Sequence, residues 1–184
     1  MGRTYDALDD GLTAFLRAQR MFFVATAPST GGHVNLSPKG LDTLAVLDPL
    51  TVAYLDLTGS GIETVAHLRE NGRITMLFCA FEGPPRLVRL FGRGTVAPIG
   101  TPEFEARAAR FPSYPNARTV ITVALERIAD SCGYGVPRYR YEAERSQLLD
   151  WADRKGPEGI AAYRDERNAT SIDGLPGLTP RPPR

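Results

Sequence analysis

The chain has 184 residues, 42% of them hydrophobic, and a formal net charge of +1. This length supports one hydrophobic core, so we expect a single domain over residues 1–184. The balanced charge lacks a basic run and argues against a nucleic-acid-binding protein. No apolar stretch reaches membrane-spanning length, and residues 1–19 carry acids rather than the apolar core of a signal peptide, so we expect a cytoplasmic protein without a membrane partner.

Apolar residues recur at helical spacing at the start of the chain and predict an amphipathic helix over residues 5–20. The segments that follow are rich in β-branched and aromatic residues, and turns containing Gly and Pro separate them. About six strands are indicated, including residues 52–57, 74–81 and 86–97, with a strand at 33–36 that ends in a turn over 37–40. In the strand over 86–97, two glycines predict a bend or bulge.

The central stretch from Thr51 to Phe81 predicts a strand, a Gly-rich turn at residues 58–61, a short helix that ends at Asn71-Gly72, and another strand. A helix start of this kind can present backbone N–H groups to an anion. Ser60 and Glu63 also fit a capping box, with the glycines serving only the turn. The residues alone favour this second interpretation, because the turn matches no phosphate-loop fingerprint.

Toward the C-terminus we expect a helix over residues 102–110 and a helical extension over 140–167, made of helices at 142–155 and 157–167. Residues 174–184 are rich in Pro, Gly and Arg, and we expect this tail to be mobile or to lie along another surface. One helix between strands that tight turns otherwise join indicates a mainly β fold with flanking helices, an antiparallel barrel.

The segments HVNLSPKG, VAYLDLTGSG, LRENGRITMLFCAF and RLVRLFGRG follow one another between about Met21 and Ile128. In order and spacing they resemble the pyridoxamine 5'-phosphate oxidase-like family, the FMN-binding split barrels. The resemblance implies a six-stranded antiparallel split β-barrel. It also implies a homodimer with a cofactor in each of two clefts between the subunits. The later stretches SCGYGVP and NATSIDGLPG point to a separate branch rather than to the vitamin-synthesising enzyme.

The resemblance further implies that the strands at residues 35–39 and 54–56 lie against FMN and that the turn and helix start over residues 58–64 hold its phosphate. Hydroxyls, backbone amides and a cation suit a phosphate dianion, and Lys39 or Arg89 could supply the charge. The implied cofactor-binding residues are Asn35, Leu36, Ser37, Lys39, Tyr54, Leu55, Asp56, Thr58, Gly59, Ser60, Gly61, Thr64 and Arg89.

The chain departs from the family pattern where the vitamin-synthesising enzymes carry a basic pair. Glu63 and Thr64 occupy those positions. Either the phosphate relies on other cations and on backbone amides, or the ligand differs. Deazaflavin is the alternative cofactor. Haem has the least support, because His33 and His67 are the only histidines and His67 is expected on the helix surface.

The expected function is that of an FMN-dependent oxidoreductase acting on a small-molecule substrate. The sequence shows no nucleophile–base pair, so catalytic residues stay unassigned, and it shows no metal-ligand cluster. A flavin protein tolerates this absence because the cofactor carries the redox chemistry. The alternative is a non-catalytic protein that binds flavin, deazaflavin or haem for sequestration or sensing.

Overall fold

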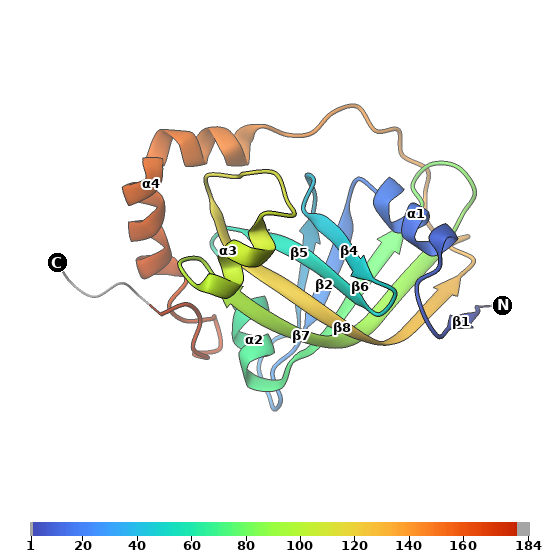
Figure 1. Ribbon diagram of the computed structural model, residues 1–184, viewed down its shortest axis with the longest axis horizontal. Coiled ribbons are helices and arrows are strands. Elements are labelled where there is room, and N and C mark those ends of the chain that lie inside the picture. Colours follow the sequence, from blue (N-terminus) through green and yellow to red (C-terminus); the bar gives the residue numbers. More distant parts are fainter. Residues whose placement is uncertain (1, 180–184) are drawn as a thin grey trace.

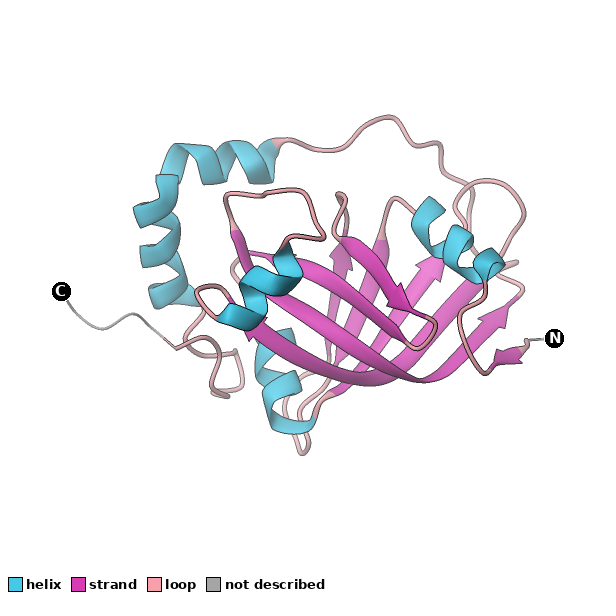
Figure 2. Cartoon of the chain, in the orientation of Figure 1, coloured by secondary structure: helices cyan, strands magenta, loops and turns pink. Residues whose placement is uncertain are grey.

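The computed structural model describes residues 2–179, and antiparallel strands make up most of it (Figure 1, Figure 2). The strands of the sheet are β1 (Thr4–Tyr5), β2 (Phe22–Thr26), β3 (Asn35–Lys39), β4 (Leu44–Asp48), β5 (Thr51–Leu57), β6 (Arg73–Cys79), β7 (Leu87–Pro98) and β8 (Ala117–Ser131).

The strands follow the order β3-β2-β6-β7-β8-β5-β4, and β1 pairs with β8 at the side of this path. All pairings are antiparallel. Within residues 2–179 the two end strands, β3 and β4, do not pair with each other, so the barrel is split between them. The predicted class, a mainly β antiparallel split barrel with flanking helices, is confirmed. Residues 2–179 form eight strands rather than the expected six, and β1 contributes only two residues.

Two local features follow from proline and glycine. β3 runs through Pro38, where a turn was expected. Proline has no N–H group, but within residues 2–179 β3 is an edge strand and pairs on one side only, so the strand can continue without that hydrogen bond. In β7 the register against β8 shifts between Phe91 and Gly92, which is the predicted irregularity. A Cβ atom at Gly92 would lie 2.1 Å from the carbonyl oxygen of Ala124, so only glycine allows this approach of the two backbones.

The barrel interior holds the main hydrophobic core. Phe22 stacks on Phe78 with ring centroids 5.3 Å apart and meets Tyr54 edge-on at 5.8 Å. A second cluster lies on the other face of β5 and β8, under helix α3 (Pro102–Ala108), and includes Leu55 and Phe104. Side chains of β5 therefore alternate between the two clusters, with Tyr54 in the first and Leu55 in the second.

The N-terminal helix is shorter than predicted. Helix α1 spans Asp10–Ala18 because the Asp9 carboxylate caps it, accepting the Leu12 N–H at 2.7 Å. Before it, β1 pairs with β8 instead of joining the helix expected from residue 5. Helix α2 (Glu63–Asn71) ends as predicted at Gly72, whose φ of 72° is left-handed.

An extended segment, residues 132–146, connects β8 to the C-terminal helix, and we call it the strap. It runs over one end of the barrel to helix α4 (Gln147–Arg167) at the far side (Figure 1). The C-terminal helix begins at Gln147 rather than near residue 140. Gly156 adopts a non-helical backbone inside α4 and divides it where two helices were predicted.

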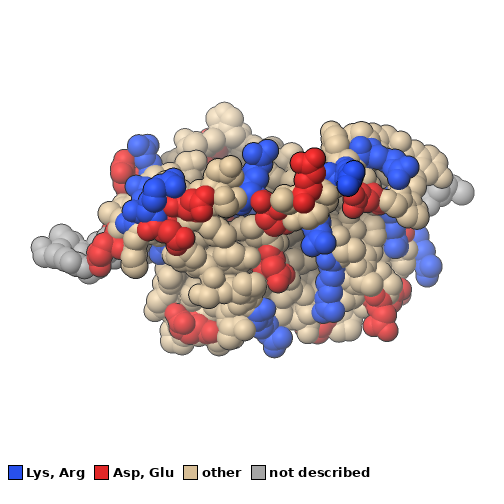
Figure 3. All heavy atoms as spheres, turned by 90° about the horizontal axis from the view of Figure 1, so that it is seen from above, with Lys and Arg blue, Asp and Glu red and all other residues tan. Residues whose placement is uncertain are grey.

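A closing loop, residues 168–178, follows α4. Thr170 bridges to Pro176, and Leu178 is buried against helix α2. The expected tail over 174–184 therefore lies along another surface as far as Thr179, and its remainder lies outside the described residues. In the part described, no helix is long and apolar enough to cross a membrane. Acidic and basic side chains are interspersed on the face seen in Figure 3.

Candidate functional site

The Gly-rich turn connects the end of β5 to α2, as the sequence predicts. Ile62, not Ser60, precedes the helix, and no side chain within residues 2–179 caps it. The predicted capping box is therefore wrong. The Glu63 carboxylate instead accepts the Ile172 N–H of the closing loop at 3.3 Å. Ser60 and Gly61 are exposed at the tip of the turn, beside the first N–H groups of the helix.

Polar side chains of β3 meet the start of α2. The Asn35 amide donates to Thr64 Oγ1 at 2.9 Å, and the Ser37 hydroxyl donates to Asn35 Oδ1 at 3.1 Å. The register pairs Asn35 with Thr26 and Ser37 with Val24, so both side chains lie on the barrel side of β3. The structure thus brings these three predicted residues together.

Asp56 is the centre of a buried ionic cluster. Its carboxylate is fully buried and accepts from Lys39 Nζ at 2.7 Å and from Arg118 Nε at 2.6 Å. Burial alone would raise the pKa of Asp56, but the charges of Arg118 and Lys39 outweigh burial and lower this pKa to about 2. The cluster therefore carries one carboxylate and two cations, a net charge of +1.

The Lys39 ammonium also lies 5.8 Å from the centroid of the Tyr54 ring. Tyr54 is fully buried, and its burial raises the pKa of its hydroxyl well above the ordinary value. The Asp56 charge adds to this rise, while Arg118 and Thr64 oppose it. Tyr54 is therefore neutral at physiological pH, and its ring belongs to the hydrophobic core behind Lys39.

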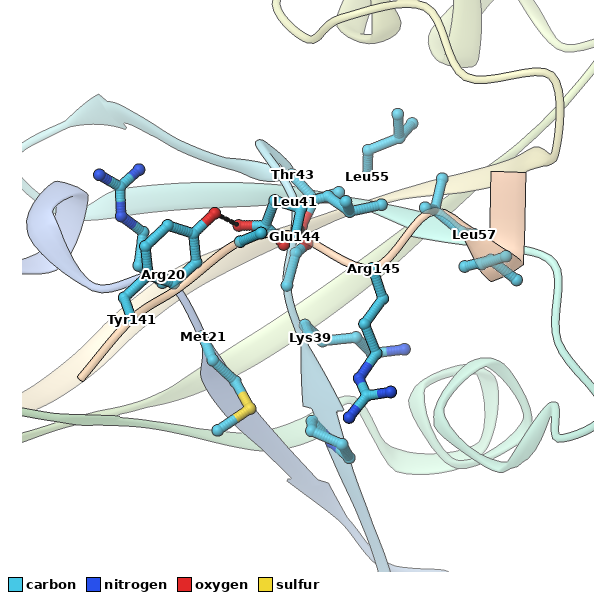
Figure 4. Close-up of a pocket in the computed structure, with 14 residues that line it drawn as sticks. Arg20, Met21, Lys39, Leu41, Thr43, Leu55, Leu57, Tyr141, Glu144 and Arg145 are labelled. Atoms are coloured by element: carbon cyan, nitrogen blue, oxygen red, sulfur yellow. Dashed lines mark hydrogen bonds between the residues drawn. The ribbon is translucent and has the colours of Figure 1, made fainter. Parts of the chain in front are cut away.

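A cavity of about 430 Å³ opens beside Lys39, under the strap (Figure 4). Its walls are largely apolar, and β3 and β5 form one side of it while the strap and the start of α4 form the other. Arg145 of the strap and Lys39 both line it, and the Tyr141 hydroxyl donates to Glu144 at its rim. The apolar lining residues are Met21, Pro38, Leu41, Leu55, Leu57, Ala143 and Leu148.

Three predicted residues lie apart from the polar group. Leu36 is 65% exposed and points to the outer face of the barrel. Leu55 packs on the other face of β5, although it also reaches the cavity. Arg89 lies on β7 and donates to Ser131 Oγ at 3.2 Å. Since β2 and β6 separate β7 from β3, one chain alone does not bring Arg89 to the turn.

Each of the two histidines has a side-chain partner. His67 is fully buried, contrary to the expected surface position, and its Nδ1 lies 3.0 Å from Thr26 Oγ1. Burial lowers the pKa of His67. His33 Nδ1 lies 2.7 Å from the Asp173 carboxylate. Among residues 2–179 no group of three or more His, Cys, Asp or Glu side chains could hold a metal ion.

The sequence did not single out three residues that hold the turn from behind: Arg118, Arg164 and Asn168. Arg118 and Asn168 are buried, and both donate to the Gly59 carbonyl, at 3.4 and 3.0 Å. Arg164 Nε donates to Thr58 Oγ1 at 2.8 Å. The one signal in the sequence was Asp56, which lies between two leucines in a predicted strand. A carboxylate buried there requires a cationic partner, so Asp56 indicates that such a partner exists. The sequence does not identify that partner.

Comparisons with known proteins agree with the order of these elements. The family model for pyridoxamine 5'-phosphate oxidase matches residues 8–132. The pyridoxamine 5'-phosphate oxidase family protein ustO of Aspergillus flavus is 40% identical over 191 residues, covering 95% of this chain and 77% of the relative.

Two solved structures show the same fold at low identity. One, described as a candidate pyridoxamine 5'-phosphate oxidase from Lactobacillus delbrueckii, has a TM-score of 0.54 and 18% identity, covering 68% of this chain and 98% of the other. The other, an FAD-binding protein from Mesorhizobium loti, has a TM-score of 0.51 and 17% identity, covering 71% and 96%. By the family match and the fungal relative, the chain belongs to the pyridoxamine 5'-phosphate oxidase family.

Proposed function

We propose that this protein is a cytoplasmic FMN-dependent oxidoreductase that acts on a small molecule. One observation carries the proposal. The exposed turn at the start of α2 lies beside Asn35, Ser37 and Thr64, and the same strands, β3 and β5, wall a largely apolar cavity. A polar end next to an apolar slot suits a ligand with a phosphate and a flat ring.

The residues present fit FMN in kind. Amides and hydroxyls at the turn, with Ser60 and Thr64 as the side chains, would hold the phosphate. The cluster around Asp56 supplies a net positive charge close to β3 and β5. Apolar side chains such as Leu55 and Leu57 would flank the ring system. When bound, the flavin supplies hydride and electron transfer, and the protein supplies orientation and exclusion of water.

We propose further that the protein acts as a homodimer, with cofactor clefts between the subunits. The outer face of β3, β2, β6 and β7 supports this, since residues 2–179 leave several of its apolar side chains exposed or only partly covered. Val34 is 75% and Leu36 is 65% exposed, and Phe23, Leu77 and Phe91 are half-buried on the same side. Such a face is more typical of an interface than of a monomer surface.

A visible absorption spectrum of the freshly purified protein tests the cofactor. The expected result is the spectrum of oxidised flavin, and mass spectrometry of the released molecule then separates FMN, FAD and deazaflavin. FAD is included because the Mesorhizobium loti protein with this fold is described as FAD-binding. A haem spectrum, or a protein that stays colourless after incubation with each flavin, would contradict the proposal.

Anaerobic reduction separates an enzyme from a binding protein. Reduced nicotinamide and reduced deazaflavin donors are mixed with the flavin-loaded protein, and bleaching of the flavin is followed in time. The proposal expects bleaching at a rate on the order of 1 per second or faster with at least one donor. A tightly bound flavin that no donor reduces would favour the sequestration or sensing alternative.

A further inference from the structure

The end of α4 holds the Gly-rich turn from the side opposite to its exposed tip. Arg164 donates from Nε to Thr58 Oγ1 at 2.8 Å and from Nη2 to the Ala117 carbonyl at 2.7 Å. Asn168 donates from Nδ2 to the Gly59 carbonyl at 3.0 Å. Two residues of one helix end therefore fix two consecutive residues of the turn, across more than a hundred positions of sequence.

The Asn168 contact continues into the buried ionic cluster. Arg118 Nη1 donates to Asn168 Oδ1 at 2.8 Å, while Arg118 Nε donates to Asp56. Asn168 is fully buried. Its amide oxygen accepts from Arg118 and its amide nitrogen donates to Gly59, so the orientation of the amide is fixed. A chain of hydrogen bonds thus runs from Asp56 to the Gly59 carbonyl, and this chain lies inside the protein rather than at the exposed tip.

Holding the Gly59 carbonyl also sets the direction of the next amide. In a planar trans peptide, the C=O of one residue and the N–H of the next point in opposite directions. With the Gly59 oxygen directed at Asn168, the Ser60 N–H is directed away from the interior. Ser60 and Gly61 are exposed. The contact between Asn168 and the Gly59 carbonyl therefore directs the Ser60 N–H toward the exposed side of the turn, where an anion can bind it.

A second contact holds the start of α2. Leu178 of the closing loop packs against Ile62 and Val65, and the Arg69 guanidinium donates to the Gly177 carbonyl. A turn with two glycines would otherwise sample many conformations, and ordering it on binding would weaken affinity. The contacts from the closing loop and from α4 remove that freedom before any ligand arrives.

We infer that Arg164 and Asn168 are positioning residues that preorganise the turn at residues 58–61 to bind a phosphate monoester. They act through Thr58 and Gly59 and do not touch the ligand. The inference rests on the proposed function, because FMN is the phosphate monoester in question. It adds a role for the C-terminal extension, which lies outside the matched family region of residues 8–132.

The test compares FMN with riboflavin, which lacks the phosphate, on wild type, Asn168→Ala, Arg164→Ala and Arg164→Lys. Arg167→Ala is the matched control, because Arg167 lies in the same last turn of α4 but its side chain is 60% exposed and pairs with Glu166, its neighbour on the surface. Quenching of flavin fluorescence gives the dissociation constants. Each alanine variant should weaken FMN about 10-fold, the equivalent of one hydrogen bond. Riboflavin binding should change little, and Arg164→Lys should fall between.

A second measurement does not need a cofactor. The Thr58 N–H donates to the Asn116 carbonyl at 2.7 Å, so its hydrogen exchange reports whether the turn is held. Exchange at Thr58 in the cofactor-free protein should be faster in Asn168→Ala and unchanged in Arg167→Ala.

The outcomes separate the two ideas. If wild type binds neither flavin, the proposed function fails, and unchanged Thr58 exchange in Asn168→Ala would then overturn the positioning role as well. If wild type binds FMN but the alanine variants lose FMN and riboflavin equally, or lose neither, the positioning role is overturned and the proposed function stands.

Discussion

Lys39 and Asp56 form an ion pair across the open seam of the barrel, with Nζ and Oδ1 2.7 Å apart. Lys39 ends β3, one end strand of the sheet, and Asp56 lies on β5, the neighbour of the other end strand. The Asp56 side chain is fully buried and that of Lys39 is 18% exposed. With Arg118 on the other carboxylate oxygen, this cluster links the two edges that strand pairing leaves apart.

The first prediction concerns the stability of this cluster. Asp56→Asn leaves Lys39 and Arg118 without their carboxylate, and breaking a buried ionic group from one side costs about 3–5 kcal/mol. Urea unfolding at pH 7 should show a loss of that size. The control is Glu126→Gln, whose partner Arg93 is 3.1 Å away and whose side chain is 58% exposed, so about 0–1 kcal/mol is expected. Equal losses in the two variants would contradict the prediction.

The second prediction is a pH dependence. The pKa of Asp56 is about 2 in the folded protein against an ordinary 3.8, so the unfolded chain binds its proton first as the pH falls. The stabilisation from this group is complete above about pH 4 and is lost toward pH 2, in total about 2 kcal/mol. The difference in unfolding free energy between wild type and Asp56→Asn should therefore shrink over this range. A constant difference would mean that Asp56 keeps its ordinary pKa.

The sequence predicts the order of the barrel elements because each depends on local patterns. The turn, the end of α2 at Gly72 and the irregularity at Gly92 follow from glycine, and the break in α4 follows from Gly156 and Pro157. Element limits were less predictable. The N-terminal helix begins late because Asp9 caps it, and β3 continues through Pro38 because it is an edge strand.

The candidate site is predictable only where neighbouring residues form it. The turn and β3 come together as expected at Asn35 and Thr64. Arg118 and Asn168 were missed because their role depends on contacts with residues 50 or more positions away. His67 was wrongly expected on the surface. A polar residue in a short helix is usually exposed, and the sequence does not show that the His67 ring forms a hydrogen bond with Thr26, which lies on a strand distant in the sequence.

The third prediction concerns Lys39 as a phosphate contact. The Lys39 ammonium has three N–H donors, and one of them donates to Asp56. The other two can donate to a phosphate oxygen. Lys39→Ala should weaken FMN binding by about 1.5–3 kcal/mol, the range for a charge-assisted hydrogen bond, and riboflavin binding much less. Lys155→Ala is the control, since Lys155 is the other lysine of the chain and lies over Trp151 in α4. Equal losses for both ligands would show that Lys39 serves Asp56 alone.

The fourth prediction concerns assembly. Wild type should sediment as a dimer at micromolar concentration, and Leu36→Glu should shift it toward a monomer, because a charge cannot be buried without a partner. Flavin should be lost together with the dimer if both subunits form the cleft. Leu50→Glu is the matched control, as Leu50 is 48% exposed in the turn between β4 and β5, away from the outer face. A compact wild-type monomer that retains flavin would refute the dimer.

The last prediction is that this member of the family does not oxidise pyridoxamine 5'-phosphate efficiently. That reaction requires a second phosphate to be held beside the flavin, and the family resemblance implies basic and imidazole side chains near the C-terminus for this purpose. Here the closing stretch SIDGLPGLTPRPPR contains no histidine, and its two arginines, Arg181 and Arg184, lie outside the described residues.

The cations described near the turn already pair with a carboxylate, so little positive charge is left to bind the phosphate of the substrate in addition to that of FMN. Lys39 and Arg118 share the Asp56 carboxylate, and Glu63 stands where the vitamin-synthesising enzymes carry a basic residue. A loosely held substrate loses most of the benefit of positioning. The FMN-loaded protein is incubated with pyridoxamine 5'-phosphate and oxygen, and pyridoxal phosphate is followed. Turnover well below about 1 per second is expected. Turnover at or above that rate would show that other residues, from the tail or the partner subunit, supply the missing charge.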